Sequence, residues 1–170
     1  MAGIFAFKCT CCGEIHEGSP SFSYPMPAYV AQLSESEKEN IIEGGTDLYK
    51  VKYEQGFHYF IRVCLEIPIH GHEDPFVWGV WVSLSEQSYN RYIETCEEVD
   101  EIDSYFGWFC NSLPYYEETQ SLKTQVRPRA GGFRPYLELE REGHELAEDL
   151  YNGITVEKAQ KIAEVCMHQG

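Results

Sequence analysis

The feature that most constrains the fold of this chain is a series of strand-forming segments near its centre. Residues 47–53, 57–67 and 76–83 are rich in β-branched and aromatic side chains, which are enriched in strands. Short segments with glycine and proline separate them and have the chemistry of turns. Residues 78–83 are apolar on both faces, which is typical of a central strand. We therefore expect a meander of antiparallel strands here.

Further elements are expected on both sides of this region. Ser34 with Glu37, and Ser83 with Glu86, have the spacing of capping boxes and predict helices over 34–43 and 86–97. Thr155 is placed to cap a last helix with an apolar stripe. Additional strands are expected at 3–8, 105–113, 122–127 and 133–139. The prediction is an α+β fold, an antiparallel sheet of about six strands with helices on one face, in a single domain of residues 1–170.

A cluster of thiols and an imidazole lies near the N-terminus, where Cys9, Cys11, Cys12 and His16 occur within eight positions. Cys9 and Cys12 have the spacing of a zinc knuckle, and Gly13 permits a tight turn under a metal. Cys9, Cys12 and His16 would bind a structural zinc ion together with a fourth ligand from elsewhere. The candidates for that ligand are Cys11, His70, His72 and His144. A packed turn of buried thiols, or a redox pair of Cys11 and Cys12, is the alternative.

The composition limits the compartment and the partners. Seven cysteines are an odd number, and their crowding favours reduced thiols and a cytoplasmic location over a disulfide framework. We expect neither a secretory signal nor a transmembrane helix. A net charge of −15 disfavours binding to nucleic acid or to anionic membranes and favours a basic protein partner.

The acidic residues are unevenly distributed along the chain. Residues 86–103 contain seven acids and one arginine, and residues 138–149 contain six acids and one arginine. Residues 119–137 contain four basic residues and no acid. This pattern predicts an acidic surface that meets a basic partner, with aromatic residues beside it as anchors. The candidate partner-binding residues are Glu97, Glu98, Asp100, Glu101, Asp103, Tyr105 and Trp108.

An ordered series of motifs resembles a family of uncharacterised bacterial proteins. The motifs include Phe7-x-Cys9-x-x-Cys12-Gly-Glu14-x-His16, residues 60–68, residues 76–85 and residues 107–116. The resemblance implies an intracellular bacterial protein in which the N-terminal Cys/His turn matters to the fold. Cys11 adds an extra thiol inside the Cys-x-x-Cys motif of this family. In type, the chain is also similar to bacterial immunity proteins, which are acidic and neutralise toxins.

The chain lacks the familiar catalytic signatures, including Gly-x-Ser-x-Gly, the phosphate loop, the dinucleotide fingerprint and His-Glu-x-x-His. We therefore predict a non-enzymatic, acidic binding protein, an immunity protein that binds and neutralises a basic toxin such as a nuclease. A nuclease holds polyanions in a positive cleft, which an acidic surface can occupy. The alternative is a zinc-binding or thiol-based protein centred on Cys9, Cys12 and His16, either a metal-dependent enzyme or a redox-responsive domain.

Overall fold

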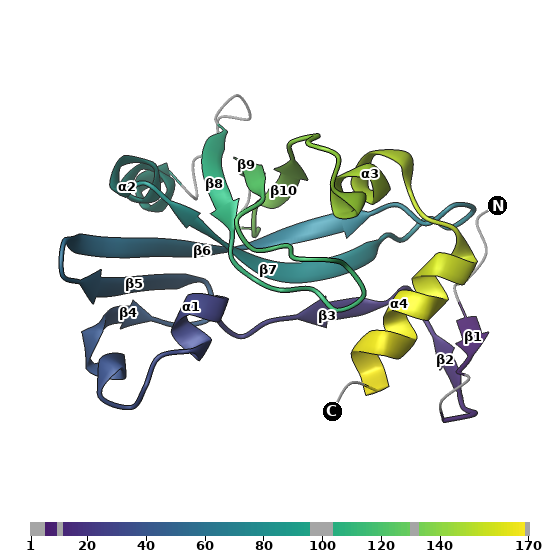
Figure 1. Cartoon of the computed structure of the whole chain (residues 1–170). Coiled ribbons are helices and arrows are strands. Elements are labelled where there is room, and N and C mark those ends of the chain that lie inside the picture. The colour runs from purple at the N-terminus through teal and green to yellow at the C-terminus, as the bar shows by residue number, and fades with distance from the viewer. Residues whose placement is uncertain (1–5, 10–11, 96–103, 130–132, 169–170) are drawn as a thin grey trace.

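The computed structural model describes residues 6–9, 12–95, 104–129 and 133–168 (Figure 1). The strands are β1 (Ala6–Lys8), β2 (Ile15–Glu17), β3 (Ser21–Ser23), β4 (Ile41–Gly44), β5 (Leu48–Tyr53), β6 (Gly56–Ile67), β7 (Phe76–Leu84), β8 (Tyr105–Phe109), β9 (Lys123–Arg127) and β10 (Tyr136–Leu139). The helices are α1 (Ala28–Ala31), α2 (Glu86–Thr95), α3 (Glu145–Asn152) and α4 (Val156–His168), with a 3-10 turn at Glu37–Asn40. The predicted α+β class is confirmed.

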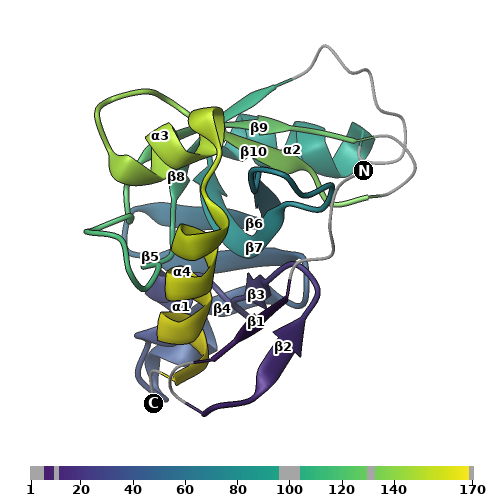
Figure 2. The same cartoon turned by 90° about the vertical axis from the view of Figure 1, so that its right-hand side faces the viewer.

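Within the described residues, one large sheet contains eight strands in the order β3-β7-β8-β9-β10-β6-β5-β4. β6 also pairs with β7, so the five strands from β6 to β10 close into a barrel. β4 and β5 extend the sheet beyond β6 as an antiparallel pair. β1 and β2 form a separate antiparallel hairpin, which lies next to the C-terminal part of α4 (Figure 2).

The prediction of a wholly antiparallel sheet of about six strands is wrong in two pairings and in strand number. β10 runs parallel to β6, with Tyr136 beside Cys64, and β3 runs parallel to β7. Neither pair joins strands that are adjacent in the chain, so no turn between them indicates the direction of pairing. Closure of the barrel depends on the long-range pairing of β10 with β6, whereas the hairpins depend on local turn chemistry.

The two faces of the long strands are both buried. Ile61 and Val63 point into the barrel, where they pack in one core cluster with side chains of α2, α3 and α4. Phe60 and Trp81 point to the outer face and pack with Val30 of α1 in a second cluster. The helices therefore cover both faces of the sheet, and the prediction of helices on one face is wrong. The expected central, doubly buried strand is β7, to which Trp81 belongs.

The local helix signals have different outcomes. Ser34 and Glu37 form the predicted capping box, with Ser34 Oγ accepting from Glu37 N at 3.2 Å and Glu37 Oε1 accepting from Ser34 N at 3.1 Å. The expected helix over 34–43 is nevertheless only the 3-10 turn, because the chain from Ile41 to Gly44 forms β4 and pairs with β5 instead. Thr155 caps α4 as predicted, accepting a bond from Lys158 N at 3.1 Å.

Helix α4 carries the end of the chain toward the hairpin of β1 and β2 (Figure 2). Its buried residues Ala159, Ile162 and Ala163 join the barrel core, and Cys9 of the N-terminal turn belongs to the same cluster. Packing of this apolar stripe fixes the direction in which the last turn of α4 projects. None of the described helices is long and apolar enough to cross a membrane.

Candidate functional site

The turn between β1 and β2 has the backbone geometry of a metal-binding knuckle. Gly13 N donates to Cys9 O at 2.9 Å, and Cys9 N donates to Glu14 O at 2.8 Å. Gly13 has a φ of 75°, a left-handed conformation that costs a glycine little. These bonds bring Cys9 next to Gly13 and Glu14, so that the thiols of Cys9 and Cys12 lie near the same turn.

Four side chains converge at this turn, and we call them the Cys/His cluster: Cys9, Cys12, His16 and His168. One ligand atom from each residue lies within 4.8 Å of those of the other three. Cys9 Sγ is 3.1 Å from His168 Nε2, and Cys12 Sγ is 3.5 Å from His16 Nε2. The four residues are close enough to hold a metal ion.

Two sulfur–nitrogen distances in the cluster agree with the dimensions of a tetrahedral zinc site. Zinc bonds of about 2.3 Å to sulfur and about 2.0–2.1 Å to nitrogen place ligand sulfur and nitrogen about 3.6 Å apart across a tetrahedron. The two observed sulfur–nitrogen distances, 3.1 Å and 3.5 Å, are near this value. Cys9 is buried, His16 is half-buried, and Cys12 and His168 lie toward solvent.

The fourth member of the cluster is not one of the residues that the sequence suggested. His70 Nε2 lies 2.8 Å from the carbonyl oxygen of Asn152, the last residue of α3, and His70 is not a member of the cluster. His144 is the N-cap of α3, where its Nδ1 accepts a hydrogen bond from Leu146 N at 3.0 Å. His72 is not a member of the cluster, and Cys11 lies outside the described residues. The cluster instead takes His168, which sequence analysis missed because its neighbours are set by the packing of α4.

The predicted partner-binding residues are only partly described. Glu97, Glu98, Asp100, Glu101 and Asp103 lie outside the described residues. Tyr105 is 5% exposed and packs in the barrel core, so little of its side chain is accessible in this structure, and its role in partner binding stays a prediction. Trp108 is 44% exposed, as expected of an anchor. The difference follows from strand alternation, because residues three apart on a strand point to opposite faces.

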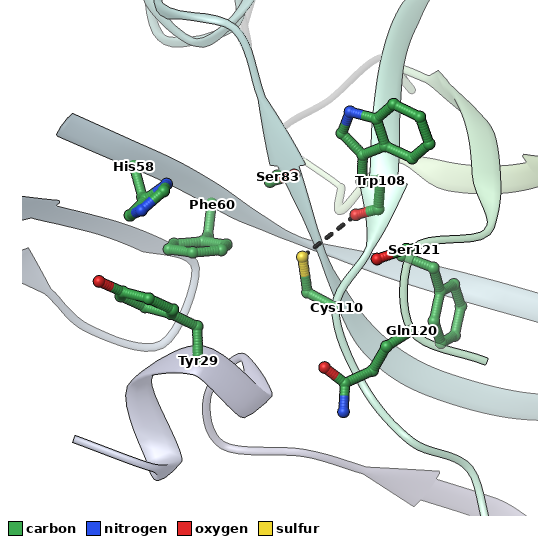
Figure 3. Close-up of a pocket in the computed structure, with 9 residues that line it drawn as sticks. Tyr29, His58, Phe60, Ser83, Trp108, Cys110, Gln120 and Ser121 are labelled. Atoms are coloured by element: carbon green, nitrogen blue, oxygen red, sulfur yellow. Dashed lines mark hydrogen bonds between the residues drawn. The ribbon is translucent and has the colours of Figure 1, made fainter. Parts of the chain in front are cut away.

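Trp108 also lines a cavity of about 560 Å³ on the outer face of the barrel (Figure 3). Tyr29, His58 and Phe60 stand on one side of this cavity, and Trp108, Gln120 and Ser121 stand on the other. Ser83 and Cys110 lie between them. The two sides meet here because Ser83 of β7 is the register partner of Trp108 on β8.

Burial shifts the pKa of two side chains in this cavity. Burial raises the pKa of the Cys110 thiol to about 11, and this thiol donates to Trp108 O at 3.2 Å. A protonated, hydrogen-bonded thiol is a poor nucleophile. Burial lowers the pKa of His58, whose ring stacks on Tyr53 with 4.2 Å between centroids. The arrangement is suited to binding uncharged groups and offers no activated nucleophile.

Fold and cluster together define a small α+β barrel protein whose two ends meet at a Cys/His cluster. The chain belongs to the family described as "Uncharacterized protein conserved in bacteria (DUF2199)", whose model matches residues 8–154. The predicted family resemblance is thus confirmed. The matched segment contains Cys9, Cys12 and His16 and ends before α4, which carries His168. Neither a curated protein nor a solved structure matches the chain.

Proposed function

We propose that this protein binds one zinc ion through Cys9, Cys12, His16 and His168. The observation that carries the proposal is the mutual proximity of their four ligand atoms, all within 4.8 Å. Two thiolates and two imidazoles are a common donor set of structural zinc sites. Reduced thiols of this kind suit a cytoplasmic protein.

The role of the ion is structural in this proposal. Four protein ligands complete a tetrahedral site and leave no position for a substrate, whereas catalytic zinc keeps one position open. The donors come from both ends of the chain, since Cys9 and His168 are 159 positions apart. Cross-linking such distant residues restricts the unfolded chain, as closing any long loop does. The ion would therefore fasten α4 to the N-terminal hairpin.

Zinc content of the purified protein tests this proposal. We expect about one zinc per chain in the wild type and a loss of most of it in Cys12→Ser and His168→Ala. Cys64→Ser and His72→Gln are matched controls, because both residues lie outside the cluster, and both should retain the ion. A wild-type protein without zinc, or full zinc retention in both cluster variants, would contradict the proposal.

A second proposed function is non-enzymatic binding of a basic protein, in the manner of an immunity protein that neutralises a toxin such as a nuclease. Phe106 and Trp108 favour it, because both are more than 40% exposed on one face of β8. Large exposed aromatic side chains are enriched at the centres of interfaces. The net charge of −15 would attract and orient a basic partner.

Affinity capture from the native cell lysate tests the second proposal, with the wild type and Trp108→Ala compared side by side. We expect one basic protein that is recovered by the wild type and lost by the variant. Its association rate should fall as salt is raised, because the attraction is electrostatic. Charge reversal of Glu97, Glu98 and Asp100 to lysine should slow association as well. Association that is indifferent to both salt and charge reversal would contradict the proposal.

A further inference from the structure

Two neighbouring cavities beside β6, β7 and β8 form one groove. The first is the cavity of about 560 Å³ described above, and the second measures about 320 Å³. His58, Ser83 and Trp108 line both cavities, so the two are continuous across these side chains. We call the pair the aromatic groove. Figure 3 shows its first half, with Trp108 facing the wall of Tyr29, His58 and Phe60.

The groove lies where β7 and β8 pair over a short stretch. The two strands pair only at Val82 with Phe109 and at Ser83 with Trp108. Gly107 permits this close approach, since a Cβ there would lie 2.8 Å from Ser83 O. Beyond this contact the second cavity opens between Phe57 and Phe106. Ser83 therefore lies where the two cavities meet and lines both of them.

The walls of the groove are aromatic and open to solvent. Tyr29, Phe57, Phe106 and Trp108 are between 37% and 44% exposed. Among the described residues, those that line the two cavities include no aspartate, glutamate, lysine or arginine, although 24% of the chain is charged. His58 is neutral at pH 7, because burial lowers its pKa. Exposed aromatic surface of this kind marks an interaction site for uncharged groups.

Carboxylates stand at both ends of the groove. At the first end, Glu118 Oε1 accepts from Gln120 N at 2.9 Å, and Gln120 lines the cavity. At the second end, Glu86 lies beside Tyr59, where burial and this neighbouring carboxylate raise the pKa of the phenol. A cation is present at the same end, since Lys50 Nζ lies 4.5 Å from the centroid of Phe57. The chain as a whole is strongly negative, which favours cationic flanks on a ligand.

We propose that the aromatic groove binds an extended, proline-containing segment of a partner protein, with basic residues on both sides of the prolines. A polyproline II segment advances about 3.1 Å per residue and is recognised by aromatic-lined grooves. Successive apolar residues would occupy the two cavities that meet at Ser83 and stack on Trp108. The basic flanks would meet Glu118 and Glu86. This inference rests on the second proposed function, partner binding, and is independent of the zinc proposal.

Titration of the 170-residue chain with a synthetic peptide tests the inference. The peptide has a central run of prolines, and it has lysines at each of its two ends. Calorimetry gives the affinity, and tryptophan fluorescence gives the place of binding, because Trp78 and Trp81 are fully buried and only Trp108 is exposed. We expect saturable binding with a change in fluorescence. Trp108→Ala and Tyr29→Ala should each weaken the affinity about tenfold or more. Phe133→Ala, an exposed aromatic outside the groove, should leave it within about twofold.

Three results would overturn the inference. The first is no saturable binding of the proline peptide at about 1 mM, a weak affinity for any specific site. The second is equal binding of a glycine–serine peptide with the same lysines, which would show attraction by charge alone. The third is unchanged affinity in both groove variants. If the peptide fails while Trp108→Ala still loses the captured native partner, the groove inference is wrong and partner binding stands.

Discussion

Cys9 Sγ lies 3.1 Å from His168 Nε2, although the two residues are 159 positions apart and near opposite ends of the chain. Cys9 is 1% exposed and packs in the same core cluster as Ala159, Ile162 and Ala163 of α4. The hairpin of β1 and β2 thus reaches the end of α4 through both apolar packing and the Cys/His cluster. A metal ion bound by the Cys/His cluster would link this hairpin to the end of α4.

The first prediction concerns thermal stability. Removal of zinc with a chelator should lower the Tm of the wild type by about 5–15 °C, because a cross-link between distant residues contributes about 2–4 kcal/mol and each kcal/mol shifts Tm by about 2–4 °C at this size. Scanning calorimetry with and without chelator measures the effect. His168→Ala should start at the lower Tm and respond little to the chelator. An equal response in wild type and variant would contradict this prediction.

The second prediction concerns a buried polar network that links α3, α4 and the segment before β9. Tyr116 donates to Asp149 Oδ2 at 2.7 Å, and Lys158 Nζ lies 2.7 Å from the same oxygen. Lys158 also reaches Glu145 Oε1 at 2.9 Å. Asp149 is only 8% exposed, so it depends on these partners for compensation.

Removing the carboxylate should therefore be costly. Asp149→Ala leaves a buried phenol and an ammonium without their shared acceptor, and we expect a loss of about 3–5 kcal/mol in the free energy of unfolding. Tyr116→Phe removes one hydrogen bond and should cost about 1 kcal/mol. Urea unfolding of both variants checks the order. A larger loss in Tyr116→Phe than in Asp149→Ala would be inconsistent with this network.

The third prediction concerns His58. Burial lowers the pKa of His58, which favours the neutral imidazole in the folded protein. Because the folded value lies below the unfolded value of about 6.5, the stability that neutral His58 contributes is complete above about pH 6.5 and is lost as the pH falls through the folded pKa. Tyr53 stacks on this ring at 4.2 Å and covers it.

An NMR titration of the His58 ring checks this prediction directly. In the wild type the pKa should lie below about 6.5, and in Tyr53→Ala it should rise toward that value, because water reaches the ring. Tyr151→Ala, a partly exposed tyrosine elsewhere, serves as the control and should leave the pKa of His58 unchanged. A wild-type value at or above the ordinary one would show that burial does not govern this histidine.

Sequence patterns predicted the local structure better than the site. Strands 48–53, 56–67 and 76–84 match their expected positions closely, because β-branched and aromatic runs with turns between them specify hairpins. The parallel pairings of β10 with β6 and of β3 with β7 depend on contacts that no adjacent turn encodes. The barrel could therefore not be inferred from a series of strands.

In the candidate site, too, the local part could be predicted from the sequence and the long-range part could not. The spacing of Cys9, Cys12 and His16 lies within one turn and could be recognised in the chain. The position of His168 depends on the length of α4 and on which of its faces is buried, so periodicity predicted the helix without predicting this neighbour. The aromatic groove likewise arises from the register that sets Ser83 beside Trp108. Side chains that meet through register or helix packing leave no short-range signal.

The measurement that most directly tests the central claim is X-ray absorption at the zinc edge of the purified protein. Our account predicts in the wild type a first shell of two sulfur ligands at about 2.3 Å and two nitrogen ligands at about 2.0–2.1 Å, and a loss of most of the zinc signal in Cys12→Ser and His168→Ala. A shell with the same ligands in the His168 variant, or one dominated by oxygen, would contradict a zinc ion bound between the two ends of the chain.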